Sequence, residues 1–190
     1  MMLFASIADG SVRQEEVVVE DALLLRVAAG NKLAFTTLYR RVGRSVYAYA
    51  LSVLKDPAEA EDVMQDTFLK LRSSAPLYRP EGKPMAWIMT IAKNICLMRI
   101  RQQRTLLYFA PEERFREEAF TVIPDVEDRI VLQAALRTLT DEECQIIVLH
   151  AVTGWKHREI AQLLELPLST VLSKYRRGLK KLRAELEGTR

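Results

Sequence analysis

The stretch GWKHREIAQLLELPLSTVLSKYRRGLKKLR (residues 154–183) carries the pattern that decides the fold. A short segment with helical periodicity ends at a break over residues 165–167. A longer one then begins at Ser169, a residue type that caps helix N-termini. Two helices joined by a tight turn are typical of a helix-turn-helix. A solvated basic face would explain the second helix alone, but not the helix and the turn that precede it.

The second helix of this motif, expected to end near residue 187, has an apolar face and a separate polar face. The apolar face, which should be buried, consists of Val171, Tyr175, Leu179 and Leu182. The polar face begins with hydroxyl groups and continues with cations. A recognition helix places early residues on base edges and later cations on phosphates. The residues that we therefore expect to contact duplex DNA are Ser169, Thr170, Ser173, Lys174, Arg176, Arg177 and Lys181.

Helical periodicity also dominates the rest of the chain. Strand-like alternation is nearly absent, and the seven glycines and seven prolines mostly separate long apolar-periodic stretches. We therefore predict an all-α fold, in which two small helical domains are joined by a flexible acidic linker and the C-terminal domain is the helix-turn-helix. The expected segments are an N-terminal extension (1–19), a first domain (20–104), the linker (105–127) and a second domain (128–190).

One predicted helix of the first domain, over residues 57–73, has an acidic outer face. This face contains Asp62, Gln65, Asp66 and the apolar Leu69. It would repel DNA but suits a basic protein partner, with Leu69 as an apolar anchor. The alternative is a solvated acidic surface near a helix N-terminus, which the helix dipole favours. On the residues alone, this alternative is the preferred interpretation.

A second predicted helix of this domain, over residues 84–104, is basic together with the loop before it. Residues 79–104 carry six cations, Arg99 among them, and one acidic residue. The side chains expected to pack inward are Trp87, Ile88, Ile91, Ile95 and Met98, whereas Lys93, Asn94, Arg101 and Arg104 lie on another side. Such a surface can take a single DNA strand, because cations hold phosphates and an aromatic pocket holds unstacked bases.

Composition limits the other functions. The net charge of +3 is a sum over opposed surfaces, and no apolar run approaches the ~20 residues that span a membrane. The two cysteines and two histidines fit no zinc pattern, and no paired nucleophile and base or phosphate-binding loop is present. We therefore expect a cytoplasmic protein that is not an enzyme, with no catalytic residues, no cofactor, no metal and no membrane insertion.

Four stretches together resemble one family, the extracytoplasmic-function (ECF) group of bacterial sigma factors. Besides residues 154–183 they are AEAEDVMQDTFLKL (58–71), PMAWIMTIAKNICLMRIRQQR (84–104) and LRTLTDEECQIIVLH (136–150). The resemblance implies an initiation factor that directs core RNA polymerase to specific promoters and helps to open the −10 element. It also implies an anti-sigma factor as a partner, although no residue identifies one.

The resemblance assigns each surface to a partner. It implies that Asp62, Gln65, Asp66 and Leu69 dock on the clamp helices of the largest polymerase subunit, which reverses the preference for a merely solvated face. The helix-turn-helix would read the −35 element as duplex DNA, and its domain would also bind the flap of the second-largest subunit. The residues implied to read and open the −10 element are Arg79, Lys83, Asn94, Arg101 and Arg104.

Four residues of the helix-turn-helix depart from the family's pattern. Leu172 and Lys174 stand where Lys and Arg are more common, which affects the −35 sequence preference and not the fold. Lys156 stands where a capping serine is usual, and the loss of such a cap costs about 1 kcal/mol unless another group replaces it. Glu165 stands where glycine is usual, and a left-handed conformation there is strained for a residue with a side chain.

The main alternative function is a stand-alone helix-turn-helix transcriptional regulator, with residues 20–104 as a sensor or dimerisation domain. A plain helical adaptor and an enzyme are further alternatives. Neither a sensor domain nor an adaptor needs the cationic surface of residues 79–104, which argues against both.

Overall fold

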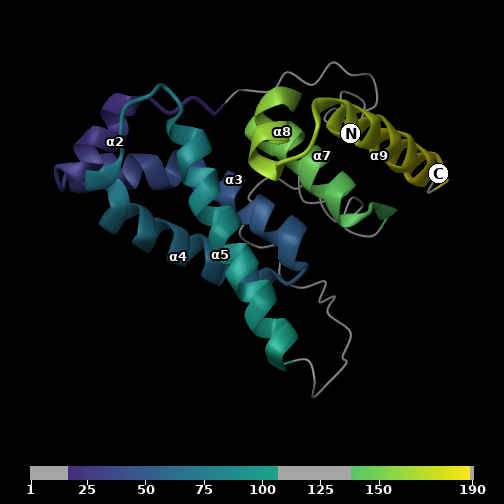
Figure 1. Cartoon of the computed structure of the whole chain (residues 1–190), viewed down its shortest axis with the longest axis horizontal. Coiled ribbons are helices and arrows are strands. Elements are labelled where there is room, and N and C mark those ends of the chain that lie inside the picture. The colour runs from purple at the N-terminus through teal and green to yellow at the C-terminus, as the bar shows by residue number, and fades with distance from the viewer. Residues whose placement is uncertain (1–16, 107–137, 189–190) are drawn as a thin grey trace. The chain divides into compact units, whose positions relative to one another are not determined.

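The computed structural model describes residues 17–106 and 138–188, which belong to two compact units (Figure 1). The helices of the first unit are α2 (Asp21–Ala28), α3 (Lys32–Leu54), α4 (Pro57–Ser74), the short 3-10 helix η1 (Ala75–Leu77) and α5 (Pro84–Leu106). Those of the second unit are α7 (Asp141–Thr153), α8 (His157–Leu164) and α9 (Leu168–Gly188). No strand occurs within these two ranges, so the predicted all-α fold of two helical domains is confirmed. Most of the predicted linker and N-terminal extension lies outside the described residues.

Polar side chains start the long helices of the first unit where the sequence places them. The Asn31 side chain accepts a hydrogen bond from the Ala34 N–H at 2.9 Å, and Asp56 accepts one from the Glu59 N–H at 3.0 Å. Pro57 follows Asp56 at the start of α4, where its missing N–H costs nothing. These caps fix where α3 and α4 begin.

Apolar side chains between α3, α4 and α5 form the core of the first unit. Its buried members include Leu38, Val42 and Val46 of α3, Val63, Phe68 and Leu71 of α4, and Ile88, Met89, Ala92 and Cys96 of α5.

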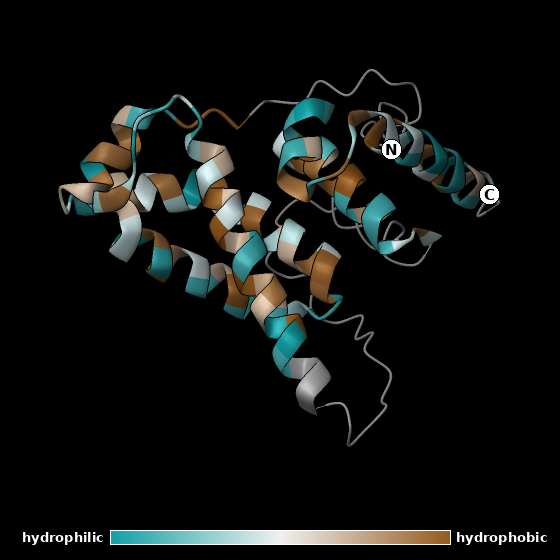
Figure 2. Cartoon of the chain, viewed as in Figure 1, coloured by the Kyte–Doolittle hydropathy of each residue, from teal (hydrophilic) through white to brown (hydrophobic). Residues whose placement is uncertain are grey.

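The buried face of α5 differs from the predicted one. Ile88 is buried as expected, but Ile91 and Ile95 are only half-buried and Met98 is 48% exposed. Figure 2 shows hydrophobic residues along most of α5, so apolar spacing alone could not choose between two neighbouring faces. The observed face carries Ile88, Met89, Ala92 and Cys96 and packs against α3 and α4, which leaves Met98 exposed and Ile91 and Ile95 half-buried.

The helix-turn-helix consists of α8 and α9. Lys156 offers no side-chain cap to α8, but the Glu159 carboxylate accepts the Lys156 backbone N–H at 2.8 Å. Glu159 therefore supplies one half of a capping box and replaces part of the missing cap. α8 ends at Glu165, whose φ of +57° is left-handed although the residue is not glycine.

α7 and α9 approach closely at a buried glycine. A Cβ atom added to Gly178 would lie 2.6 Å from Ile147 Cδ1 and 3.6 Å from Glu143 Cβ. Glu143 also closes a capping box with Thr140, in which each residue's side chain accepts the other's backbone N–H. The start of α7 is thus fixed at its contact with α9.

A cluster of three rings joins the helices of the second unit. The ring centroids of His150 in α7, His157 in α8 and Tyr175 in α9 lie 4.5 to 4.8 Å apart. His150 Nδ1 lies 2.7 Å from the backbone oxygen of Trp155. Burial, and then the neighbouring His150, lower the pKa of His157 below its ordinary value.

The left-handed backbone at Glu165 predicts a stabilising substitution. Glu165→Gly should raise the free energy of unfolding of the second unit by about 1 kcal/mol, because glycine has no Cβ to strain this conformation. Glu165→Ala is the matched control, since it removes the same side chain but keeps Cβ and should give no such gain. Urea unfolding followed by Trp155 fluorescence, in a Trp87→Phe background, reports on this unit. Equal stability of the two variants would contradict the strain.

The lowered pKa of His157 predicts that the second unit loses stability on acidification. The unfolded chain takes up a proton on this residue as the pH falls through about 6.5, whereas the folded unit does so only at lower pH. The contribution is therefore fully present above that pH and decreases below it. Urea unfolding at a series of pH values should show that the free energy of unfolding of the second unit falls with pH below about 6.5 in wild type, and falls less steeply in His157→Gln. An unchanged slope in the variant would refute the assignment.

Candidate nucleic-acid and protein interfaces

The acidic face of α4 is exposed in the structure. Asp62 and Leu69 have exposed side chains, at 59% and 64%, Gln65 is exposed, and Asp66 is half-buried. These four residues follow one another along one side of the helix, as the spacing predicts. The structure therefore brings the predicted docking residues together.

Arg99 of α5 pairs with this acidic face. Its guanidinium lies 2.8 Å from Asp66, 3.2 Å from Glu59 and 3.9 Å from Asp62. The hydrogen bond to Asp66 is the largest of the effects that raise the pKa of Arg99 above its already high value. The sequence analysis counted Arg99 among the cations of the DNA-binding surface. In the structure its guanidinium instead forms ion pairs with the carboxylates of α4.

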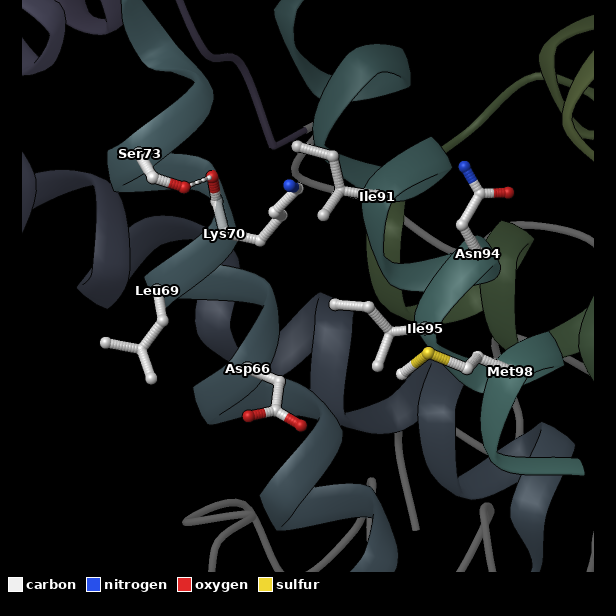
Figure 3. A pocket seen from close by; sticks show the side chains of 8 residues that line it. All are labelled: Asp66, Leu69, Lys70, Ser73, Ile91, Asn94, Ile95 and Met98. Atoms are coloured by element: carbon white, nitrogen blue, oxygen red, sulfur yellow. Dashed lines mark hydrogen bonds between the residues drawn. The ribbon is translucent and has the colours of Figure 1, made fainter. Parts of the chain in front are cut away.

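An open groove of about 660 Å³ lies between α4 and α5 (Figure 3). Its lining residues are Asp66, Leu69, Lys70, Ser73, Ile91, Asn94, Ile95 and Met98. Figure 3 shows the three apolar side chains of α5 pointing toward α4, while the amide of Asn94 points away from it. Asn94, predicted to bind DNA, thus lines the same groove as the predicted docking residues Asp66 and Leu69.

A second pocket, of about 370 Å³, lies between the loop over residues 78–83 and the first turns of α5. Its lining includes Tyr78, Arg79, Lys83 and Trp87, and the two aromatic rings lie 5.1 Å apart. Trp87 is half-buried at the pocket wall, rather than in the core as expected. Arg79 and Lys83 are exposed beside it. Two aromatic surfaces and two exposed cations are the groups that bind an unstacked base and its phosphates.

The predicted −10 residues are spread along α5. Arg79 and Lys83 lie before its first turn, and Arg101, which is exposed, lies about 25 Å further along the helix. The side chain of Arg104 lies outside the described residues. A single pocket cannot collect these cations, but an extended strand lying along α5 could meet them in turn.

The sequence missed Asp21, which ties this loop to α2. One carboxylate oxygen accepts the Tyr78 O–H, and the other accepts the Gly82 backbone N–H at 2.9 Å. No local signal could have revealed it, because an acidic residue at a helix start is ordinarily explained by the helix dipole.

The polar face of α9 divides into exposed and paired side chains. Ser169, Ser173, Arg176 and Arg177 are exposed, and Thr170 is half-buried. Beyond its first turns, α9 carries mostly hydrophilic residues (Figure 2). These five residues remain together on the surface of the recognition helix.

Lys174 and Lys181 instead pair with acidic residues of α7. Lys174 Nζ lies 2.5 Å from Glu142, and Lys181 Nζ lies 2.6 Å from Glu143, whose side chain is only 4% exposed. Burial alone would raise the pKa of Glu143, but the hydrogen bonds from Lys181 and Thr140 outweigh it, and the pKa lies below its ordinary value. The structure thus gives both lysines an intramolecular contact.

Each of the two units matches a known protein family. The family described as Sigma-70 region 2 matches residues 38–105, and Sigma-70, region 4 matches residues 129–182. No helix within the described ranges is long and apolar enough to cross a membrane.

Among curated proteins, the chain is similar to the ECF RNA polymerase sigma factor SigK of Mycobacterium sp. (strain KMS). The two are 31% identical over 174 residues, which cover 86% of this chain and 88% of the relative. SigK of Mycobacterium tuberculosis (strain H37Rv) is 30% identical over 173 residues, covering 86% and 91%.

Two solved structures have a similar fold. CnrH in complex with the cytosolic domain of CnrY has a TM-score of 0.61 and 25% identity, covering 89% of this chain and 97% of that one. The sigma factor RpoE from Bartonella quintana, solved with the anti-sigma factor NepR, has a TM-score of 0.62 and 19% identity, covering 82% and 98%. With region 2 and region 4 both matched in order, this chain belongs to the ECF sigma factors of the sigma-70 family.

Proposed function

We propose that this chain, acting in the cytoplasm and without enzymatic activity of its own, directs core RNA polymerase to promoters through three separate surfaces. The observation that carries the proposal is the opposite character of two of them: an exposed acidic face with an apolar residue on α4, and an exposed face of hydroxyls and arginines on α9. A stand-alone DNA-binding regulator would not need the first of these.

The α4 face is proposed to dock on the clamp helices of the largest polymerase subunit. Asp62 is the carboxylate best placed to meet a basic partner, because it is exposed and lies at the outer limit of ion-pair distance from Arg99. Asp66 is already held by Arg99 at 2.8 Å. Leu69, at the edge of the groove, would be the apolar anchor beside these charges.

The loop pocket is proposed to take an unstacked base of the −10 element. Tyr78 and Trp87 supply aromatic surfaces, and Arg79 and Lys83 are positioned to hold phosphates. Arg101 and Arg104 would contact the strand further along α5, and Asn94 would do so only at the edge of the groove that it shares with α4.

The second unit is proposed to read the −35 element as duplex DNA through the start of α9. Ser169, Thr170, Ser173, Arg176 and Arg177 are the residues that the fold leaves available for this contact. Lys174 and Lys181 would contact DNA only at the expense of their pairs with α7. The same unit is proposed to bind the flap of the second-largest polymerase subunit, as the family resemblance implies.

An anti-sigma factor is a further proposed partner. The support is that RpoE, a neighbour in fold, was solved with the anti-sigma factor NepR. A protein that covers the α4 face would block polymerase docking without touching α9.

The docking proposal predicts a charge-specific loss of polymerase binding. Asp62→Arg should weaken binding to core polymerase about tenfold or more, because it places like charges opposite each other, and it should abolish promoter-specific transcription by the mixture. Glu61→Arg is the matched control: it changes the charge equally at an exposed position about 100° around the helix and should bind nearly as wild type. Fluorescence anisotropy with labelled protein and run-off transcription measure the two effects. Equal losses in both variants would refute a specific docking role for Asp62.

The division of the α9 cations predicts different effects for two of them. Arg177→Ala should weaken promoter binding by the holoenzyme about tenfold to a hundredfold and leave folding intact, because the residue is exposed. Lys181→Ala should lower the free energy of unfolding of the second unit by roughly 1–3 kcal/mol, because it leaves the Glu143 carboxylate without its cation. Filter binding at several salt concentrations and urea unfolding measure the two properties. Full stability of Lys181→Ala with a binding loss like that of Arg177→Ala would contradict this division.

A further inference from the structure

We infer that Asp21 is a positioning residue for −10 recognition: its carboxylate holds the loop over residues 78–83 in the shape that the base pocket and its two cations require. The inference rests on the proposed function of the first unit. Asp21 lies outside residues 38–105, where the chain matches Sigma-70 region 2.

The carboxylate ties both ends of the loop to α2. Its Oδ1 accepts the Tyr78 O–H where the loop begins, and its Oδ2 accepts the Gly82 N–H at 2.9 Å where the loop ends. Figure 1 shows the segment before α5 passing beside α2. A carboxylate suits this task because it offers two acceptor oxygens, and hydrogen bonds to a charged acceptor are stronger than neutral ones.

The loop has few other supports. Residues 78–83 belong to no helix. Backbone–backbone hydrogen bonds hold it at its edges, from the Tyr78 N–H to Ala75 at 3.0 Å and from the Trp87 N–H to Lys83 at 3.2 Å, and within it the Glu81 backbone hydrogen-bonds to the Tyr78 hydroxyl. Gly82, whose N–H binds Asp21, adopts a left-handed φ of +71°, a conformation that glycine takes without strain.

The held residues are those that form the pocket. Tyr78 is buried, packs against Trp87 and presents its ring to the pocket, while Arg79 and Lys83 flank it. Burial, followed by the hydrogen bond to Asp21, raises the pKa of Tyr78, which keeps the phenol protonated as a donor. Asp21 itself does not line the pocket, so it would act on DNA through these residues and not by contact.

Positioning and plain electrostatics predict opposite effects. Removing a negative charge near Arg79 and Lys83 should strengthen DNA binding if charge alone mattered. If Asp21 positions the loop, the same removal should weaken the capture of the −10 strand. The direction of the change therefore separates the two explanations.

The test uses the full chain with core polymerase. Asp21→Ala should lower the rate of promoter opening about tenfold, while core binding and affinity for −35 duplex stay as in wild type. Opening is followed with 2-aminopurine placed in the −10 element. Glu20→Ala is the matched control, since it removes the same charge from the neighbouring exposed residue, for which no bond to the loop is seen, and it should open promoters as wild type does. Circular dichroism checks that both variants fold.

Two further measurements distinguish the Asp21 bond to Gly82 from its bond to Tyr78 and test whether both act through the same loop. Hydrogen exchange in the free chain should show loss of Gly82 amide protection in Asp21→Ala but not in Tyr78→Phe, which tests the contact independently of transcription. Tyr78→Phe should slow opening less than Asp21→Ala, and the double variant should be no slower than Asp21→Ala. Opening by Asp21→Ala as fast as wild type, or losses that simply add, would overturn the inference. A wild-type holoenzyme that opened no promoter would refute the proposed function as well.

Discussion

The buried carboxylate of Glu143 ties the second unit together. It closes the capping box that starts α7 and accepts Lys181 Nζ from α9 at 2.6 Å. A buried carboxylate without its cation would destabilise the unit. Rotation of α9 against α7 would break the pair with Lys181 and is therefore disfavoured. The orientation of the recognition helix, and therefore which of its cations stay available to DNA, follows from that contact. In the first unit, Arg99 divides the charges of α4 in the same way, because it takes up Asp66 and leaves Asp62 more exposed.

Features set by neighbouring residues could be predicted from the sequence. The caps at Asn31, Asp56 and Thr140 join side chains to backbone groups three residues away, so the local sequence is enough to indicate them. The helix-turn-helix was predictable for the same reason, whereas only the glycine that is usual in the family pointed to a left-handed residue at position 165. Even the replacement cap at Glu159 has a local signature, because an acidic residue at the third position of a helix completes a capping box.

Features that join distant segments could not be predicted. Arg99 lies 33 residues from Asp66, and Lys181 lies 38 residues from Glu143, so charge counts along the chain assigned both cations to DNA. The buried face of α5 was misjudged because that helix is apolar on two neighbouring faces, and only its neighbours α3 and α4 decide which one is covered. The docking residues Asp66 and Leu69 of α4 also share one groove with Asn94 of α5, which spacing along a single helix does not reveal.

The loop between η1 and α5 has the sequence YRPEGKP, in which each of the two cations immediately precedes a proline. A residue before proline is biased toward extended backbone conformations, so the backbone at Arg79 and Lys83 has few alternatives to lose when these residues meet a phosphate. Part of the backbone entropy of ordering these two residues is therefore already lost when the chain folds, and DNA binding has only their side chains left to order. A loop with little hydrogen bonding of its own can in this way still present its charges at a fixed spacing.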